Sequence, residues 1–316
     1  MSLQPFGDLR ERLKSGRAEL AAAFLEKRAT HYLTRHAALV DSVLIELSTR
    51  LALPPSFCVA AVGGYGRGEL FPGSDVDVLL LLPHDPEPGQ QATLEAWVQA
   101  CWDVGLEIGH SVRTVDACLA EAADITVETN LLEARFVCGA AGLFDEFGRC
   151  FQTRFDAQRF FDGKLAEQHA RHARFDDSAY KLEPNLKDSP GGLRDLHTIH
   201  WLAQACGLLG GWSGIARAGL LTHAEARRIA RDLHGQRRQL TGAFAQAGTR
   251  QRAAMRAKRI RRDDVRPGGD VVRMDRFFLM RLVKFHVLCR SNCCKFFRSE
   301  PSALWAAMKS NALKAE

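Results

Sequence analysis

Residues 57–77 carry the pattern that most restricts what this chain can fold into. An apolar run at residues 57–62 predicts a buried strand, and four glycines follow it within residues 63–68, beginning with Gly63 and Gly64. Because glycine has no side chain, the backbone there can approach an anion closely, and its N–H groups can form a nest for phosphate. Arg67 adds a cation suited to phosphate. The segment therefore predicts a phosphate-binding turn after a strand.

The spacing excludes two other kinds of phosphate loop. A Walker A loop ends in Gly-Lys-Ser/Thr, whereas Gly68 is followed here by Glu69 and Leu70. The dinucleotide fingerprint G-x-G-x-x-G is also absent.

Two carboxylates follow the glycine turn. Asp75 and Asp77 stand two residues apart at the start of a predicted strand over residues 76–82, so both should point to one face of a sheet. Two such acids repel each other unless a cation lies between them. Mg²⁺ is commonly held by one or two carboxylates together with substrate phosphates. Glu107, in a third predicted strand over residues 106–113, is the candidate third carboxylate, and the set could hold two ions.

Composition is that of a globular protein of two ordinary domains. The chain has 316 residues, 46% of them hydrophobic and 25% charged. No apolar run approaches the roughly 20 residues of a membrane-spanning helix. The nine cysteines include no Cys-x-x-Cys pair, so a zinc ribbon is not supported. We therefore predict a cytoplasmic protein with no membrane partner.

The basic charge is concentrated near the C-terminus. Residues 250–300 hold fifteen basic and five acidic residues, a net charge of +10. The other 28 basic and 32 acidic residues give −4, so the body of the chain shows no nucleic-acid footprint, and a nucleic-acid partner is not expected.

The predicted elements favour an α+β fold with a small mixed sheet flanked by helices. Helical spacing of apolar residues fills the first fifty residues, and the three predicted strands follow. Helices are expected over residues 93–104, over about 115–138, and through most of 149–234, including 193–205. We predict four parts: an N-terminal helical segment at 1–55, a sheet core at 56–148, a helical domain at 149–235 and an atypical basic tail at 236–316.

Val62-Gly63-Gly64, the ten residues that follow and Asp75-Val76-Asp77-Val78 together resemble the pattern of polymerase-β-type nucleotidyltransferases. Longer blocks resemble the bacterial bifunctional PII uridylyltransferase/uridylyl-removing enzyme. These blocks lie at residues 63–77, 102–114, 124–135 and 182–195, in the same order as in that family.

The resemblance implies a nucleotidyltransferase core that transfers UMP from UTP to a tyrosine of the PII nitrogen-signalling protein and releases pyrophosphate. It assigns metal binding to Asp75 and Asp77, and by position to Glu107, with Mg²⁺ as cofactor. It assigns the nucleotide loop to Gly63, Gly64 and Ser74, with Arg67 as a triphosphate contact. The tyrosine hydroxyl needs help to lose its proton, because the unperturbed pKa of tyrosine is about 10. Glu107 is also our candidate for this role.

Two cations lie in the fourth block. Lys187 and Arg194 could contact the triphosphate or PII, or could be surface cations that cap helices and form ion pairs. The helical domain that carries them would complete the cleft for nucleotide and acceptor.

The resemblance ends near Gly235, so we expect neither uridylyl-removing activity nor glutamine sensing from this stretch. The basic tail could be a segment for RNA or a membrane surface, or could reflect a truncation or an altered reading frame. Two alternatives to PII uridylylation stay open: a nucleotidyltransferase with another acceptor, and an inactive fragment that binds a nucleotide or PII.

Overall fold

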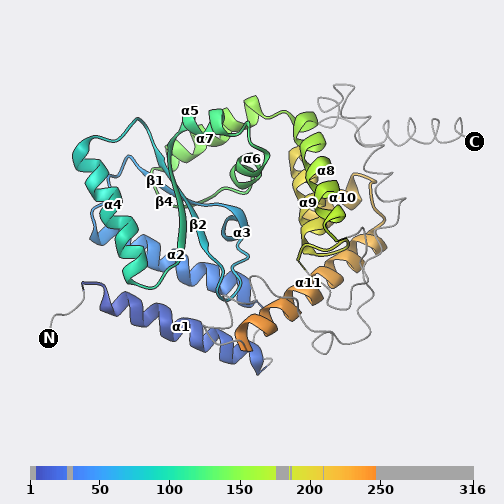
Figure 1. The fold of residues 1–316 in the computed structure, drawn as a ribbon, viewed down its shortest axis with the longest axis horizontal. Coiled ribbons are helices and arrows are strands. Elements are labelled where there is room, and N and C mark those ends of the chain that lie inside the picture. The colour runs from blue at the N-terminus through green and yellow to red at the C-terminus, as the bar shows by residue number, and fades with distance from the viewer. Residues whose placement is uncertain (1–4, 27–30, 176–184, 186, 209, 247–316) are drawn as a thin grey trace, which may run out of the picture. The chain divides into compact units, whose positions relative to one another are not determined.

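A computed structural model describes residues 5–26, 31–175, 185, 187–208 and 210–246. The chain divides into two compact units (Figure 1). The first holds the described residues up to Phe155 together with those from Leu240 onward, and the second holds Asp156–Gln239. The predicted basic tail lies outside the described residues beyond position 246, and the other predicted domain boundaries stay predictions.

The first unit is built on a mixed sheet, four-stranded over the described residues. Its strands are β1 (Cys58–Ala61), β2 (Val76–Leu82), β3 (Ile108–Thr114) and β4 (Arg135–Gly139), in the spatial order β3-β2-β1-β4. β1 pairs antiparallel with both β2 and β4, whereas β2 and β3 are parallel and are joined by a helical crossover. This sheet confirms the predicted α+β class.

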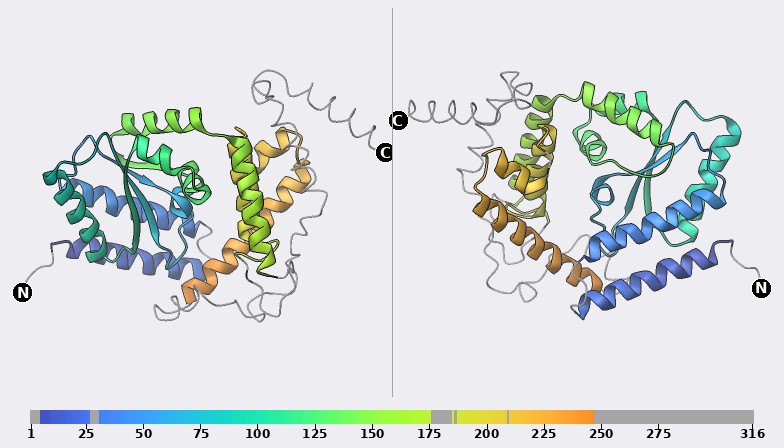
Figure 2. Two further views of the ribbon diagram at one scale, coloured as in Figure 1. Left: turned by 45° about the horizontal axis from the view of Figure 1, so that its top comes forward. Right: turned by 180° about the vertical axis from the view of Figure 1, so that it is seen from behind.

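Helices cover both faces of the sheet (Figures 1 and 2). On one face, α1 (Gly7–Leu25), α2 (Tyr32–Arg50) and α4 (Pro88–Asp103) form a core with Val76, Val78 and Leu80 of β2. On the other, α5 (Val115–Glu121), α6 (Ile125–Leu132) and α7 (Ala141–Arg154) pack on Leu79 and Leu81. Alternate residues of β2 thus enter opposite cores, so the register of this strand is fixed by burial on both sides.

The second unit is helical. It contains α8 (Ala157–Ala173), α9 (Leu193–Ala205), α10 (Gly211–Arg217) and most of α11 (His223–Gln246). Its buried apolar side chains come from all four helices, and include Phe160, Leu196, Ile199, Trp201, Ile215 and Leu233. None of the helices in the described part of the chain combines the length and apolarity needed to cross a bilayer.

Several elements differ from the predictions. The helix predicted over 115–138 is two helices followed by the strand β4, and α4 begins at Pro88 rather than near residue 93. A capping box explains the earlier start, because Glu87 and Gln90 each accept a backbone N–H of the other, and Pro88 fits the first helical position. The predicted glycine loop begins as a helical turn, α3 (Gly63–Gly66).

Candidate functional site

Asp75 and Asp77 lie at the N-terminal end of β2. Asp75 immediately precedes the strand and is exposed, and Asp77 is its second residue and is half-buried. Alternation along the strand puts both on one face, because Val76 and Val78 between and after them are buried in the opposite core. Two carboxylates thus share the end of a strand whose other residues are buried.

The carboxylate of Asp77 lies between the glycine turn and β3. A methyl group added at Gly109, its register partner on β3, would lie 2.7 Å from Oδ1 of Asp77. A methyl group added at Gly63 would lie 3.2 Å from Oδ2 and 3.4 Å from Oδ1 of Asn130. Two glycines therefore leave the space that this carboxylate occupies, and Gly63 also needs glycine for its φ of +58°.

Glu107 stands beside Asp75, immediately before β3. Its carbonyl oxygen accepts a hydrogen bond from the Val76 N–H, 2.9 Å away, and its side chain is exposed. In the described part of the chain, no three His, Cys, Asp or Glu side chains form a cluster able to hold a metal ion. The structure therefore brings the predicted acids to the same end of two neighbouring strands, but their side chains do not form a three-ligand metal site.

The carboxylate oxygens at this end of β2 nevertheless fit Mg²⁺ as ligands. Asp75 and Asp77 offer carboxylate oxygens on one face, and this ion usually takes its other ligands from water and substrate phosphates rather than from an all-protein cage. The nearby N–H groups of the first turn of α3 have no acceptor within a helix, as at every helix start, and are suited to phosphate oxygens.

The turn α3 is packed too tightly for any residue but glycine at Gly66. A methyl group there would lie 2.2 Å from the carbonyl oxygen of Glu133 and 3.0 Å from that of Ala61. The Val62 N–H also donates to the carbonyl of Asp77 at 3.0 Å, which joins the start of the turn directly to β2. The glycines therefore serve close backbone packing as well as an open turn.

Arg67 follows the turn and is engaged with acids. Its Nη1 donates to Glu133, whose side chain is 2% exposed, and its Nε lies 3.3 Å from Oε2 of Glu69. Burial opposes the charge of Arg67, but the two carboxylates outweigh it and raise the pKa of Arg67. Arg67 thus fastens the turn to the end of α6, and its predicted triphosphate contact stays a prediction, as does that of Ser74.

A second set of polar contacts joins the turn to α2 and β4. The hydroxyl of buried Tyr65 donates to Asp41, and Arg135 donates to the same carboxylate at 2.9 and 3.0 Å. The Arg135 guanidinium also lies 5.3 Å from the centre of the Tyr65 ring. Burial and the charge of Asp41 raise the pKa of Tyr65, so its hydroxyl stays protonated.

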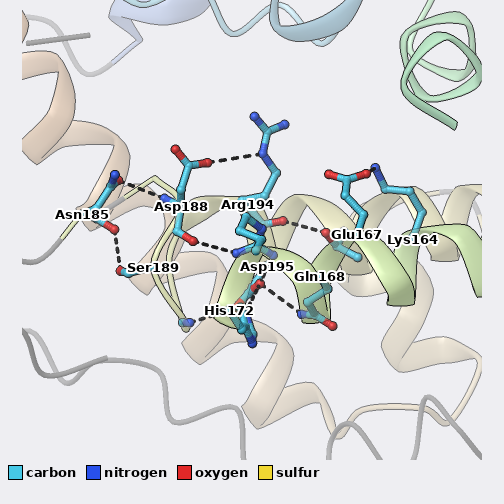
Figure 3. A network of polar contacts seen from close by, with 12 residues as sticks. Lys164, Glu167, Gln168, His172, Asn185, Asp188, Ser189, Arg194 and Asp195 are labelled. Atoms are coloured by element: carbon cyan, nitrogen blue, oxygen red, sulfur yellow. Dashed lines mark hydrogen bonds and ion pairs between the residues drawn. The ribbon is translucent and has the colours of Figure 1, made fainter. Parts of the chain in front are cut away.

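Both predicted cations lie in the second unit: Lys187 in a turn before α9 and Arg194 as the second residue of α9, where Figure 3 shows its side chain beside Asp188. The Asn185 side chain accepts the backbone N–H groups of Lys187 and Asp188, each at 3.0 Å. The Arg194 N–H donates to the Lys187 carbonyl at 2.8 Å, and its side chain forms an ion pair with Asp188 at 3.7 Å. The contact of these two cations with a nucleotide stays a prediction.

Asp195, which sequence reasoning missed, anchors this turn. It is fully buried, and its carboxylate accepts Gln168 at 3.0 Å, His172 at 3.0 Å and the Gly191 N–H at 2.7 Å, together with a hydrogen bond from Arg171 (Figure 3). Burial opposes its charge, but the bonds from His172 and Arg171 prevail and lower the pKa of Asp195 to about 2. One carboxylate thus joins the turn to α8.

Comparison with known proteins gives two family matches. The model described as a nucleotidyltransferase domain matches residues 46–125, which include the glycine turn and Asp75, Asp77 and Glu107. The model described as GlnD PII-uridylyltransferase matches residues 159–240, which include Lys187, Arg194 and Asp195.

Curated relatives agree with these models. The bifunctional uridylyltransferase/uridylyl-removing enzyme of Thiobacillus denitrificans is 80% identical over 234 residues, covering 73% of this chain and 28% of that protein. The chain is related to the bifunctional uridylyltransferase/uridylyl-removing enzymes. Those of Chromobacterium violaceum (49% identical, 72% of this chain and 27% of the relative) and Cupriavidus metallidurans (48%, 71% and 26%) match similarly.

These matches confirm the predicted resemblance to the bifunctional enzymes. The chain spans between 26% and 28% of the length of these relatives.

Proposed function

We propose that this chain is a Mg²⁺-dependent nucleotidyltransferase that transfers UMP from UTP to a tyrosine of a PII protein in the cytoplasm. The observation that carries the proposal is the position of Asp77. Its carboxylate lies between the glycine turn and β3, on the same face as Asp75, in a segment that matches a nucleotidyltransferase domain. The name of the second family model, GlnD PII-uridylyltransferase, supports the nucleotide and the acceptor.

The proposed reaction is a displacement at the α-phosphorus of UTP. The tyrosine oxygen forms a bond to this phosphorus, the bond to the bridging oxygen of the β-phosphate breaks, and pyrophosphate leaves with that oxygen. The phenolic proton must leave as the new bond forms, because the unperturbed pKa of tyrosine is about 10. We assign the acceptance of this proton to Glu107, which is exposed beside Asp75.

The other residues bind and position. Asp75 and Asp77 would hold Mg²⁺, which when bound neutralises phosphate charge and stabilises the attacking and leaving oxygens. The N–H groups of Gly63 and Gly64 would bind phosphate oxygens together with Ser74. Arg67 supports the turn through its ion pairs with Glu69 and Glu133, and its contact with the triphosphate is part of the proposal.

Labelled UTP, Mg²⁺ and purified PII test the proposal. The chain should label PII, and Asp75→Asn or Asp77→Asn should reduce the rate on the order of a hundredfold or more, because charge neutralisation is the main catalytic term. Asp85→Asn, which removes an exposed acid beyond the other end of β2, is the matched control and should leave the rate unchanged. Equal labelling by the Asp77→Asn variant, or none by the intact chain, would refute the proposal.

Nucleotide and acceptor preference need their own comparison. UTP should label PII at least tenfold faster than ATP, GTP or CTP. A different best nucleotide, or labelling of another acceptor, would retain the chemistry and correct the substrate.

A further inference from the structure

β3 is an edge strand of the sheet within the described residues, because β2 is its sole neighbour in the strand order. It is also unusually exposed for a strand beside a buried one: Gly109 and His110 are exposed, and Val112 is 39% exposed. By contrast, Val78 and Leu80 of β2, which pair with His110 and Val112, are buried. The outer side of β3 is thus an accessible margin of the sheet.

Hydrogen bonding shows which backbone groups face outward. The carbonyl of Glu107 points toward β2, where it accepts the Val76 N–H. In a parallel ladder, alternate residues direct their N–H and C=O groups to the same side, so Gly109, Ser111 and Arg113 also bond to β2. The N–H and C=O groups of His110 and Val112 therefore point to the outer edge. Such an edge is a template for pairing with another strand.

This edge runs directly beside the candidate active site. Because Gly109 has no side chain, the Asp77 carboxylate reaches over β3, with Oδ1 only 2.7 Å from where a Gly109 methyl group would be. A strand added outside β3 would lie about 4.8 Å from it. Its residue opposite Gly109 would point to the face that carries Asp77. An edge strand added to β4 would instead be separated from β2 by β1 and β4.

We propose that the outer edge of β3 binds the acceptor protein as an added strand, which places the acceptor tyrosine opposite Gly109 and beside Asp77. The occupant is an extended polypeptide segment, because backbone pairing with His110 and Val112 requires one. The exposed Val112 side chain adds an apolar contact on the other face of the sheet. This inference rests on the proposed function for the identity of the acceptor.

Amide hydrogen exchange with PII carrying phenylalanine in place of the acceptor tyrosine tests the proposal without any transfer step. In the free chain, the His110 and Val112 amides should exchange rapidly and those of Gly109 and Ser111 slowly. Adding the acceptor should slow exchange at His110 and Val112 at least tenfold and leave Gly109 and Ser111 unchanged. If His110 and Val112 keep their free rates when the acceptor is present at saturating concentration, the proposal is wrong.

Kinetics of edge variants give a second measurement. Val112→Pro removes an outward N–H, which an edge strand tolerates, whereas Val112→Thr keeps it. Val112→Pro should raise the KM for PII at least tenfold with the KM for UTP unchanged, and Val112→Thr should retain the KM of the wild-type chain. Transfer that proceeds with the same KM for PII in Val112→Pro would overturn the docking edge while leaving the proposed function intact. Absence of transfer by the wild-type chain would refute the function, and amide exchange would still decide the docking.

Discussion

Gly109 leaves the space that the Asp77 carboxylate needs. Gly109→Ala would put a methyl group 2.7 Å from Oδ1 of Asp77, closer than real contacts of this kind, so the carboxylate must turn away. We expect kcat/KM for nucleotidyl transfer to fall roughly tenfold to a hundredfold, since a displacement of about 1 Å at a catalytic group has effects of this size. Thermal unfolding should change little, because Gly109 is exposed.

Gly89→Ala is the matched control for this substitution. Gly89 lies in the first turn of α4, and a methyl group there would meet nothing within 4 Å. Its transfer rate should equal that of the wild-type chain. Full activity of Gly109→Ala alongside this control would mean that the position of Asp77 does not limit the reaction.

At the scale of elements, α3 depends on the ion pair between Arg67 and Glu133. Glu133→Gln would leave the guanidinium of Arg67 without its most buried acid, and breaking such a pair typically costs about 3 kcal/mol. Urea unfolding of the first unit should show this loss. Glu121→Gln provides the control, because it removes an acid of the same type from an ion pair with Arg113 in which the acid is 53% exposed, and should cost less than about 1 kcal/mol. Equal losses in the two variants would contradict a special role for the buried pair.

The elements also show what the sequence could predict. The bounds of β2 and α9 match their predictions because apolar runs and helical spacing are local signals there. β4 was missed because four of its residues are only half-buried and Gly139 is exposed, so its sequence carries no strong strand signal. The strand forms by pairing with β1, which lies far away in the sequence. Asp124, whose side chain accepts the Thr126 and Val127 N–H groups, was a helix-start signal that would have divided the predicted helix.

The residues of the candidate site also fall into those that the local sequence predicted and those that it did not. The spacing of the glycines, Asp75 and Asp77 was enough to place both acids on one face of a strand. Asn130 near Gly63, Glu133 on Arg67, and Asp41 under Tyr65 were not predicted. Each comes from an element distant in sequence, so only the packing of the sheet and its helices brings it to the turn.

For the molecule as a whole, the buried carboxylate of Asp195 makes the stability of the second unit sensitive to acid. The pKa of Asp195 is about 2 in the folded chain against 3.8 for an ordinary aspartate. The unfolded state therefore binds more protons at low pH, and stability falls as the pH falls from about 4 to 2. The loss for this group amounts to about 2 kcal/mol. We expect the second unit to lose structure in this pH range, and the NMR signal of the buried Trp201 indole would report the loss.

Asp195→Asn separates this titration from general acid unfolding. The variant should be less stable at neutral pH, because Arg171 is buried beside the lost charge, but its stability should depend less on pH between 4 and 2. Asp162→Asn, which removes an exposed carboxylate of α8, should keep the pH dependence of the wild-type chain. If Asp195→Asn and the wild-type chain lost the Trp201 signal with the same pH dependence, another group would control the acid stability of this unit. The turn at Lys187, which Asp195 joins to α8, would then not owe its acid sensitivity to that carboxylate.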